Sequence, residues 1–149
     1  LLGLHALALE DVVNVHQRAK VDLFDDYLFV VARMIDGEET DVTEQISFFL
    51  KKGLLISFQE RPGDCWDGIR QRIRQRQGRV AASGPDYLLY QLLDAIIDSY
   101  FPVMDRIVDA VDLLEEEITL RTAPEQMRRV HQLRGQLLSL RRSIRPHRE

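Results

Sequence analysis

The stretch SGPDYLLYQLLDAIIDSYFPVMDRIVDAVDLLEEEITL, residues 83–120, decides the fold, because its pattern predicts one long helix. Ser83 and Asp86 form a Ser-x-x-Asp capping pattern, and Pro85 falls in the first turn, where its missing N–H does no harm. Apolar residues then recur at helical spacing along one broad face. Pro102 removes one backbone donor within this pattern, so we expect a bend there.

The same helix has a carboxylate face opposite its apolar face. At about 100° per residue, the acidic side chains fall in one stripe. Its members are Asp94, Asp98, Asp105, Asp109, Asp112 and Glu116. Such a stripe either faces solvent, contacts a basic partner, or contributes oxygen ligands to a cation.

A second helix follows and carries the opposite charge. Residues 122–125 (Thr-Ala-Pro-Glu) form another capping box, which places a short turn before Pro124. Residues 86–120 hold nine acids and one arginine, whereas residues 124–149 hold seven arginines and two glutamates. A short connection between long helices predicts an antiparallel hairpin. Its second helix presents an apolar heptad seam of Val130, Leu133, Leu137, Leu140 and Ile144.

The first half of the chain alternates β-rich runs with short helices. A helix is predicted from Leu4 to Val15, followed by a polar linker over residues 16–20. Three β-rich runs come next, with a turn at residues 36–39 and a hairpin through Lys51-Lys52-Gly53. They are Tyr27–Met34, Gln45–Leu50 and Leu54–Phe58. Another helix begins after Asp64 and Asp67, with Trp66, Ile69 and Ile73 on one side.

These elements predict an α+β fold, in which a small antiparallel sheet is packed with helices and followed by a long antiparallel two-helix arm. We expect a first domain over residues 1–80 and the arm over residues 83–149. Leu1 is not an initiator methionine, and the seam of the last helix stops abruptly. We therefore expect a fragment of a longer protein, truncated at its N-terminus.

Composition argues against several functional classes. The 149 residues have a net charge of −4 and a single cysteine, Cys65, so neither an internal disulfide nor a cysteine-rich zinc site is expected. No phosphate-binding loop, nucleophile elbow or His-Glu-x-x-His motif occurs, which makes an enzyme the least supported class. Arginines 70–76 form a basic helix face without interleaved aromatic residues, so a solvated face is favoured over nucleic-acid binding.

The remaining chemistry is that of carboxylates. Glu10 and Asp11 are adjacent in the first predicted helix, and the acidic stripe of the long helix offers further oxygens. Oxygen ligands completed by water suit Mg²⁺ or Ca²⁺ better than zinc or copper. The alternative is that the Glu10–Asp11 pair is solvated surface, and that the stripe faces solvent or the arginine-rich helix.

Three segments together resemble the cytoplasmic domain of CorA-type magnesium/cobalt transporters. They are HALALEDVVNVHQR (residues 5–18), FQERPGD (58–64) and DYLLYQLLDAIID (86–98), and the resemblance includes residues 27–29, 100–103, 114–117, 131–134 and 140–146. It covers essentially the whole chain. Alanines 6 and 19 stand where the family usually has proline, and Arg145 and His147 replace residues that are usually apolar.

The resemblance implies a function for the chain. It implies a cytosolic metal-sensing domain of a divalent-cation (Mg²⁺, Co²⁺) channel in the inner membrane, with the stalk and transmembrane helices absent from these residues. Its partners would be its own subunits, in a homopentamer, and divalent cations, with no nucleic acid. Regulatory Mg²⁺, for which Co²⁺ could substitute, would bind between subunits at Asp11, with Glu10 beside it and Asp94 at an auxiliary site.

Two alternatives remain open at this point. A zinc-transporting branch of the same superfamily shares the architecture. A soluble helical scaffold, binding a protein partner through its acidic face, would use the same amphipathic helices without any metal. Two apolar segments of about 20 residues beyond residue 149 of the gene would favour a transporter over the scaffold.

Overall fold

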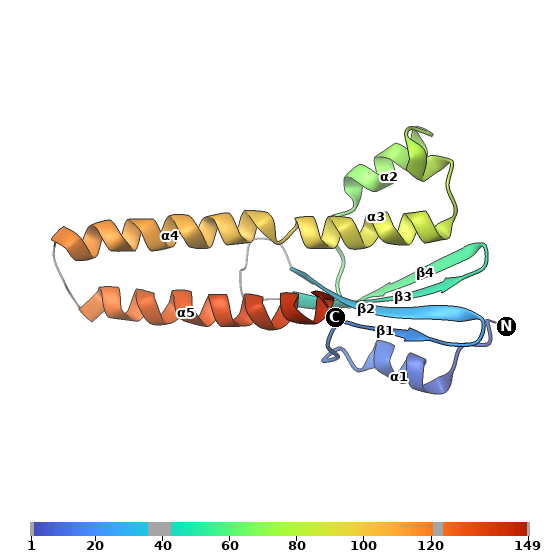
Figure 1. The fold of residues 1–149 in the computed structure, drawn as a ribbon, viewed down its shortest axis with the longest axis horizontal. Coiled ribbons are helices and arrows are strands. Elements are labelled where there is room, and N and C mark those ends of the chain that lie inside the picture. Colours follow the sequence, from blue (N-terminus) through green and yellow to red (C-terminus); the bar gives the residue numbers. More distant parts are fainter. Residues whose placement is uncertain (1, 36–42, 121–123, 149) are drawn as a thin grey trace.

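The computed structural model describes residues 2–35, 43–120 and 124–148. A four-stranded antiparallel sheet has helices on both faces, and a helical hairpin extends from one end of it (Figure 1). This arrangement confirms the predicted α+β class. The turn predicted at residues 36–39, and the start of the capping box at 122–123, lie outside the described residues.

The sheet is a simple meander in the order β1-β2-β3-β4. The strands are β1 (Lys20–Leu23), β2 (Tyr27–Ile35), β3 (Thr43–Lys51) and β4 (Leu54–Gln59), and all neighbours are antiparallel. Three of them match the predicted runs. The first, β1, begins at Lys20, the residue that ended the predicted linker; as a short edge strand with two charged side chains, it lacks the apolar run of a buried strand.

Alternation along the strands separates two packed faces. One face carries Phe29, Val31 and Phe49 against α1 (Ala6–Val13). The other face carries Val30, Ile46 and Phe48 among their buried neighbours, against α3 (Pro85–Asp98). Since Val30 and Val31 are adjacent in β2, this central strand is buried on both sides, as its continuous apolar run predicts.

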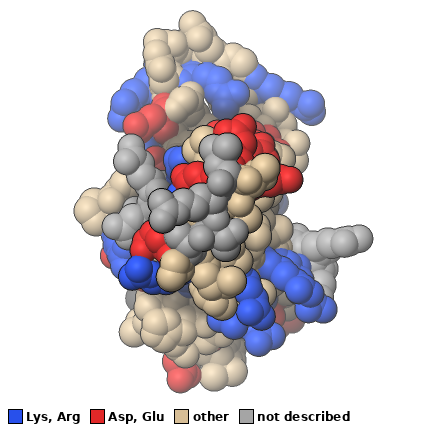
Figure 2. All heavy atoms as spheres, turned by 90° about the vertical axis from the view of Figure 1, so that its left-hand side faces the viewer, with Lys and Arg blue, Asp and Glu red and all other residues tan. Residues whose placement is uncertain are grey.

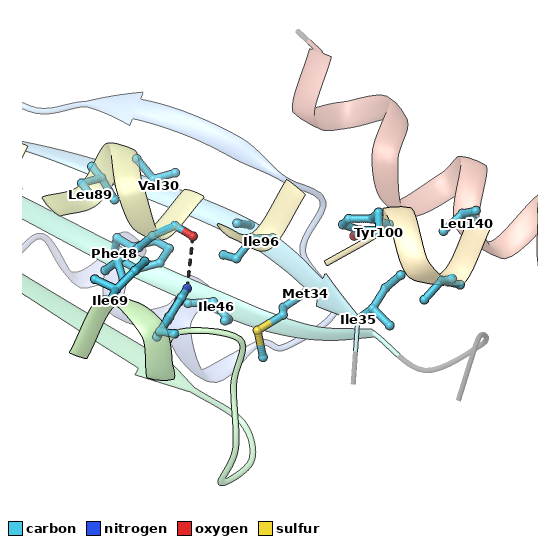
Figure 3. Close-up of a cluster of buried hydrophobic side chains, with 14 of the residues drawn as sticks. Val30, Met34, Ile35, Ile46, Phe48, Ile69, Leu89, Ile96, Tyr100 and Leu140 are labelled. Carbon is cyan, nitrogen blue, oxygen red and sulfur yellow. Dashed lines mark hydrogen bonds between the residues drawn. The ribbon is translucent and has the colours of Figure 1, made fainter. Parts of the chain in front are cut away.

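The core on the α3 side joins the sheet to two helices. Phe48 and Ile46 of the sheet face Leu89 and Ile96 of α3 (Figure 3). Trp66, immediately before α2 (Asp67–Arg74), packs with its ring centre 5.8 Å from that of Phe48 and donates its Nε1–H to the Leu92 carbonyl of α3 at 3.1 Å. This hydrogen bond ties α2 to α3 without leaving the indole donor unpaired.

Asp64 and Asp67 do not cap α2 as the sequence predicted, because its N-cap is Trp66, without a side-chain cap hydrogen bond, and Asp67 is its first residue; Asp64 instead fixes the approach to the helix. Asp64 accepts the Trp66 N–H at 2.9 Å and a guanidinium N–H of Arg70 at 2.6 Å. Burial raises the pKa of the Asp64 carboxyl, but these hydrogen bonds outweigh it and hold the pKa below its ordinary value. Arg70 therefore has an intramolecular role, whereas Ile73, predicted to lie on the packed side, is 39% exposed.

The predicted single long helix is divided in two. α3 ends at Asp98 and α4 (Phe101–Leu120) begins three residues later, in line with it (Figure 1). Pro102 removes an N–H at this point, and the Tyr100 N–H instead bonds to the third residue back, Ile97, at 3.1 Å. The buried Tyr100 hydroxyl donates to the carbonyl of Arg33 at 2.8 Å, which fixes the junction on the sheet.

The start of α3 also differs from the prediction. Its N-cap is Gly84, and no side chain caps the helix, so Ser83 does not form the expected capping pair with Asp86. A Cβ at Gly84 would lie 2.7 Å from an Asp86 carboxylate oxygen, so a side chain at this position would displace that carboxylate. The helix start therefore relies on Pro85 and on the acidic residue in its first turn.

The arm is the antiparallel pair α4 and α5 (Pro124–Ile144). Glu117 pairs with Arg129 at 2.6 Å across it, which agrees with the predicted opposition of charge. Only part of the heptad seam is covered: Leu140 is buried and Leu133 is half-buried, whereas Leu137 is 48% exposed.

Seen from the end of the arm, the largest acidic cluster lies above the centre, with basic side chains at the top and lower right (Figure 2).

Candidate metal centre

The predicted metal-binding pair lies on α1, a two-turn helix on the side of the sheet opposite α3 (Figure 1). His5 caps the helix, its Nδ1 accepting the Leu7 N–H at 3.2 Å. Ala8 is buried against the sheet, and its small side chain lets the helix approach closely. Glu10 and Asp11 follow in the last turn, where Glu10 is exposed and the Asp11 side chain is 22% exposed.

Two polar side chains of the sheet, one buried and one half-buried, fix the position of this turn. Gln45 of β3 is 2% exposed; its Nε2–H donates to the Asp11 carbonyl at 2.7 Å, and its Oε1 accepts the Gln17 N–H at 3.0 Å. Arg33 of β2 donates to the Val15 carbonyl at 2.9 Å. These bonds satisfy backbone groups at the end of α1 and hold the Asp11 backbone at a defined place over the sheet.

The Asp11 carboxylate has a cationic neighbour. Lys20 Nζ lies 2.6 Å from an oxygen of Asp11 and 2.7 Å from an oxygen of Asp22. Burial lowers the pKa of Lys20, but its hydrogen bonds to the two aspartates outweigh that effect, and the net pKa is raised. The ammonium therefore carries its charge throughout the physiological pH range, bridging α1 and β1.

Asp94 is not brought to the other two residues. It lies exposed on α3, and the sheet separates α3 from α1. Across the described ranges, no three His, Cys, Asp or Glu residues gather closely enough to hold a metal ion. The oxygens of Glu10 and Asp11 suit the chemistry of Mg²⁺, but one chain supplies only a small part of the ligands that a bound ion requires.

The acidic stripe continues along the arm. Its described members on α4 are exposed, and a surface hollow near the end of the helix is lined by Asp112, Glu115, Glu116 and Thr119. All four belong to one helix, so the hollow gathers carboxylates only along a single face. It offers no convergent set of ligands from separate elements.

Two residues at this site were not predicted from the sequence. Lys20 was assigned to a linker, although its alternation with Asp22 is a signal of an edge strand. Gln45 lay within a predicted strand, and only the fold reveals that it faces the end of α1. A buried glutamine in a strand is a signal of a polar contact, but the partner is 34 residues away in the chain.

A family model described as the CorA-like Mg²⁺ transporter protein matches residues 1–149, the whole chain. The chain belongs to this CorA-like family. The family is one of transporters and not of enzymes, which confirms the resemblance and the non-enzymatic class predicted from the sequence.

Named relatives agree with this assignment. The CorA-like chain is 43% identical over 150 residues to a cobalt/magnesium transport protein, CorA, of Thermotoga maritima, an alignment covering 99% of this chain and 43% of the relative. In fold it matches the full-length CmaX protein, with a TM-score of 0.84, 23% identity and coverage of 99% of this chain and 46% of that one. It also matches the soluble domain of CorA from Methanocaldococcus jannaschii, with a TM-score of 0.81, 20% identity and coverage of 99% and 59%.

The CorA-like chain thus spans less than half the length of the Thermotoga relative. Within the part of the chain that the structure describes, no helix is both long enough and apolar enough to cross a membrane. The matched soluble domain has the same arrangement of sheet, flanking helices and long helix pair.

Proposed function

We propose that this chain is the cytosolic metal-sensing domain of a homopentameric CorA-like channel for Mg²⁺ and Co²⁺ in the inner membrane. The observation that carries the proposal concerns Asp11, whose backbone is held in place by Gln45, yet whose carboxylate has too few acidic neighbours among the described residues to hold an ion. A carboxylate of a neighbouring subunit would complete the site. The pore and the membrane-spanning helices would belong to parts of the full-length protein outside residues 1–149.

The sensing mechanism follows from electrostatics. Carboxylates that face one another across a subunit boundary repel, and a bound divalent cation neutralises that repulsion. Mg²⁺ would therefore favour the closed ring, because it binds that arrangement better than any other. When cytosolic Mg²⁺ falls, the site empties, the repulsion returns, and the ring shifts toward an open or asymmetric state. The transported ion is the substrate, and the ion at Asp11 is the regulator.

The donor chemistry favours Mg²⁺ over zinc at this site. Asp11 and Glu10 offer hard carboxylate oxygens, and Mg²⁺ keeps several of its waters while taking one or two carboxylates. Zinc sites in proteins are typically built on Cys sulfur and His nitrogen. Asp94, exposed on the opposite side of the sheet, would take part only through a different copy of the chain.

The substitution Asp11→Ala in the full-length protein tests the proposal. The variant should require at least about tenfold more Mg²⁺ than the wild type for half-maximal protection against limited proteolysis, because a lost charge-assisted ligand removes 1.4 kcal/mol or more. Inhibition of flux by intracellular Mg²⁺ should weaken in parallel.

The matched control is Asp109→Ala, which removes one exposed carboxylate from the arm. Its Mg²⁺ midpoint should stay within about twofold of the wild type, since exposed charges away from a site contribute little. An unchanged midpoint in Asp11→Ala would refute the sensing role of this residue. If the Mg²⁺ midpoint shifts equally in Asp11→Ala and Asp109→Ala, the shift reflects the change in net charge and not a metal site at Asp11.

A further inference from the structure

The Asp11 carboxylate shares a cation with a second aspartate of its own chain. Lys20 Nζ lies 2.6 Å from Asp11 Oδ2 and 2.7 Å from Asp22 Oδ2, and 5.7 Å from the centre of the Phe29 ring. The Lys20 side chain is 34% exposed and that of Asp22 is 43% exposed. The ammonium is thus held at the surface by two carboxylates and one aromatic face.

The sheet places these groups together. In the antiparallel pair of β1 and β2, Lys20 lies opposite Val31 and Asp22 lies opposite Phe29. Val31 and Phe29 belong to the cluster packed beneath α1, so the side chains of Lys20 and Asp22 project toward the same side as α1. The last turn of α1 brings Asp11 over them. The contact therefore depends on backbone register and not only on the flexibility of a long lysine.

We propose that Lys20 is a tethered competing cation that sets the Mg²⁺ concentration at which the Asp11 site fills. This inference rests on the proposed function of Asp11. An ammonium at 2.6 Å already occupies one of the two Asp11 carboxylate oxygens, Oδ2, and partly neutralises the carboxylate charge. Metal binding must therefore displace Lys20 from Asp11 or accept a second positive charge close by, and either one lowers the affinity for metal.

Asp22 can keep the Lys20 ammonium paired after a metal ion displaces it from Asp11. Because Lys20 already contacts Asp22, it can leave Asp11 without becoming unpaired, which makes the exchange with metal easily reversible. The two partners should then have opposite effects. Removing the Lys20 charge should favour metal at Asp11, whereas removing the Asp22 charge should leave Asp11 as the only carboxylate paired with Lys20 among the described residues and disfavour metal.

The test compares variants of the full-length protein by the Mg²⁺ concentration that gives half-maximal protection against limited proteolysis. Lys20→Met should lower this midpoint by about 2- to 5-fold, the range expected from loss of an exposed ion pair. Asp22→Asn should raise it, and Lys20→Arg, which keeps the charge, should stay close to the wild type. A purely structural ion pair would raise the midpoint, or leave it unchanged, in Lys20→Met.

Lys51→Met is the matched control. Lys51 pairs with Asp26 and its side chain is 33% exposed, but it lies opposite Tyr27 at the start of β2, four residues before Val31, the partner of Lys20. The Mg²⁺ midpoint of Lys51→Met should equal that of the wild type. If the midpoint of Lys51→Met falls as far as that of Lys20→Met, the change in net charge explains both results and the inference is overturned. If Asp11→Ala loses its Mg²⁺ response while Lys20→Met keeps the wild-type midpoint, only the role of Lys20 fails. If Asp11→Ala keeps its response, the proposed function itself fails.

Discussion

Replacing Phe48 with alanine should lower the free energy of unfolding by about 3–5 kcal/mol, the typical cost of removing a buried aromatic ring. Phe48 is 0% exposed, at the centre of the core between the sheet and α3 (Figure 3). Its ring contacts Trp66, which itself joins α2 to α3. The cavity would therefore weaken three elements at once, and little of it can close by local movement.

Equilibrium unfolding in urea measures this effect, with circular dichroism and Trp66 fluorescence as two probes of one transition. Phe101→Ala is the matched control, because its ring is 53% exposed at the start of α4 and its loss should cost less than about 1 kcal/mol. Equal losses in the two variants would contradict the assignment of Phe48 to the core.

Replacing Phe29 with alanine should also cost about 3–5 kcal/mol, but on the other face of the sheet. Phe29 is 0% exposed, packs at 4.7 Å from the Phe49 ring, and belongs to the cluster that includes Ala8 of α1. α1 has only two turns, so it depends on this packing more than on its own hydrogen bonds. Loss of the ring should loosen the helix that carries Asp11.

Amide hydrogen exchange distinguishes this result from that of Phe48→Ala. Phe29→Ala should raise exchange most strongly in α1, whereas Phe48→Ala should raise it most strongly in α2 and α3. The Mg²⁺ midpoint of the full-length protein should rise in Phe29→Ala, since Asp11 would no longer be held in place. Unchanged protection in α1 would show that its position does not depend on this cluster.

The sequence predicted the elements whose pattern is strong. Continuous apolar runs identified β2, β3 and β4, and helical spacing identified the helices of the arm. Both signals arise because apolar residues recur wherever a helix or strand turns a side chain toward the core. The break between α3 and α4 was predicted only as a bend at Pro102. The helix divides at residues 99–100, next to the Asp98 carbonyl that loses the Pro102 donor, and Tyr100 anchors this junction to β2 by a tertiary contact that local pattern does not reveal.

The sequence pattern failed to predict the cap of α3 and the edge strand β1. A Ser-x-x-Asp pattern at residues 83–86 was wrong as a cap because Gly84, one residue later, is the N-cap. The strand β1 was missed because four residues with two charges pair with β2 only through the fold. These errors share a cause: short elements are determined by their neighbours in space more than by their own residues.

The candidate site was predicted from resemblance and carboxylate chemistry, and the structure adds the parts that only a fold reveals. The prediction placed Glu10 and Asp11 on one helix and Asp94 on another without placing the two helices relative to each other, and the sheet separates Asp94 from the other two. Lys20 and Gln45, which pair with the Asp11 side chain and backbone, could not be assigned to it from spacing alone. The completion of the metal site by a second subunit stays a prediction.

Anomalous diffraction at the cobalt edge, from crystals of the full-length protein grown with Co²⁺, tests the central claim most directly. We expect a peak at the Asp11 carboxylate, at about 2.1 Å or through one coordinated water, facing a carboxylate of a neighbouring subunit. Strong peaks elsewhere with none at Asp11, or an assembly in which Asp11 faces solvent far from any neighbouring subunit, would contradict it.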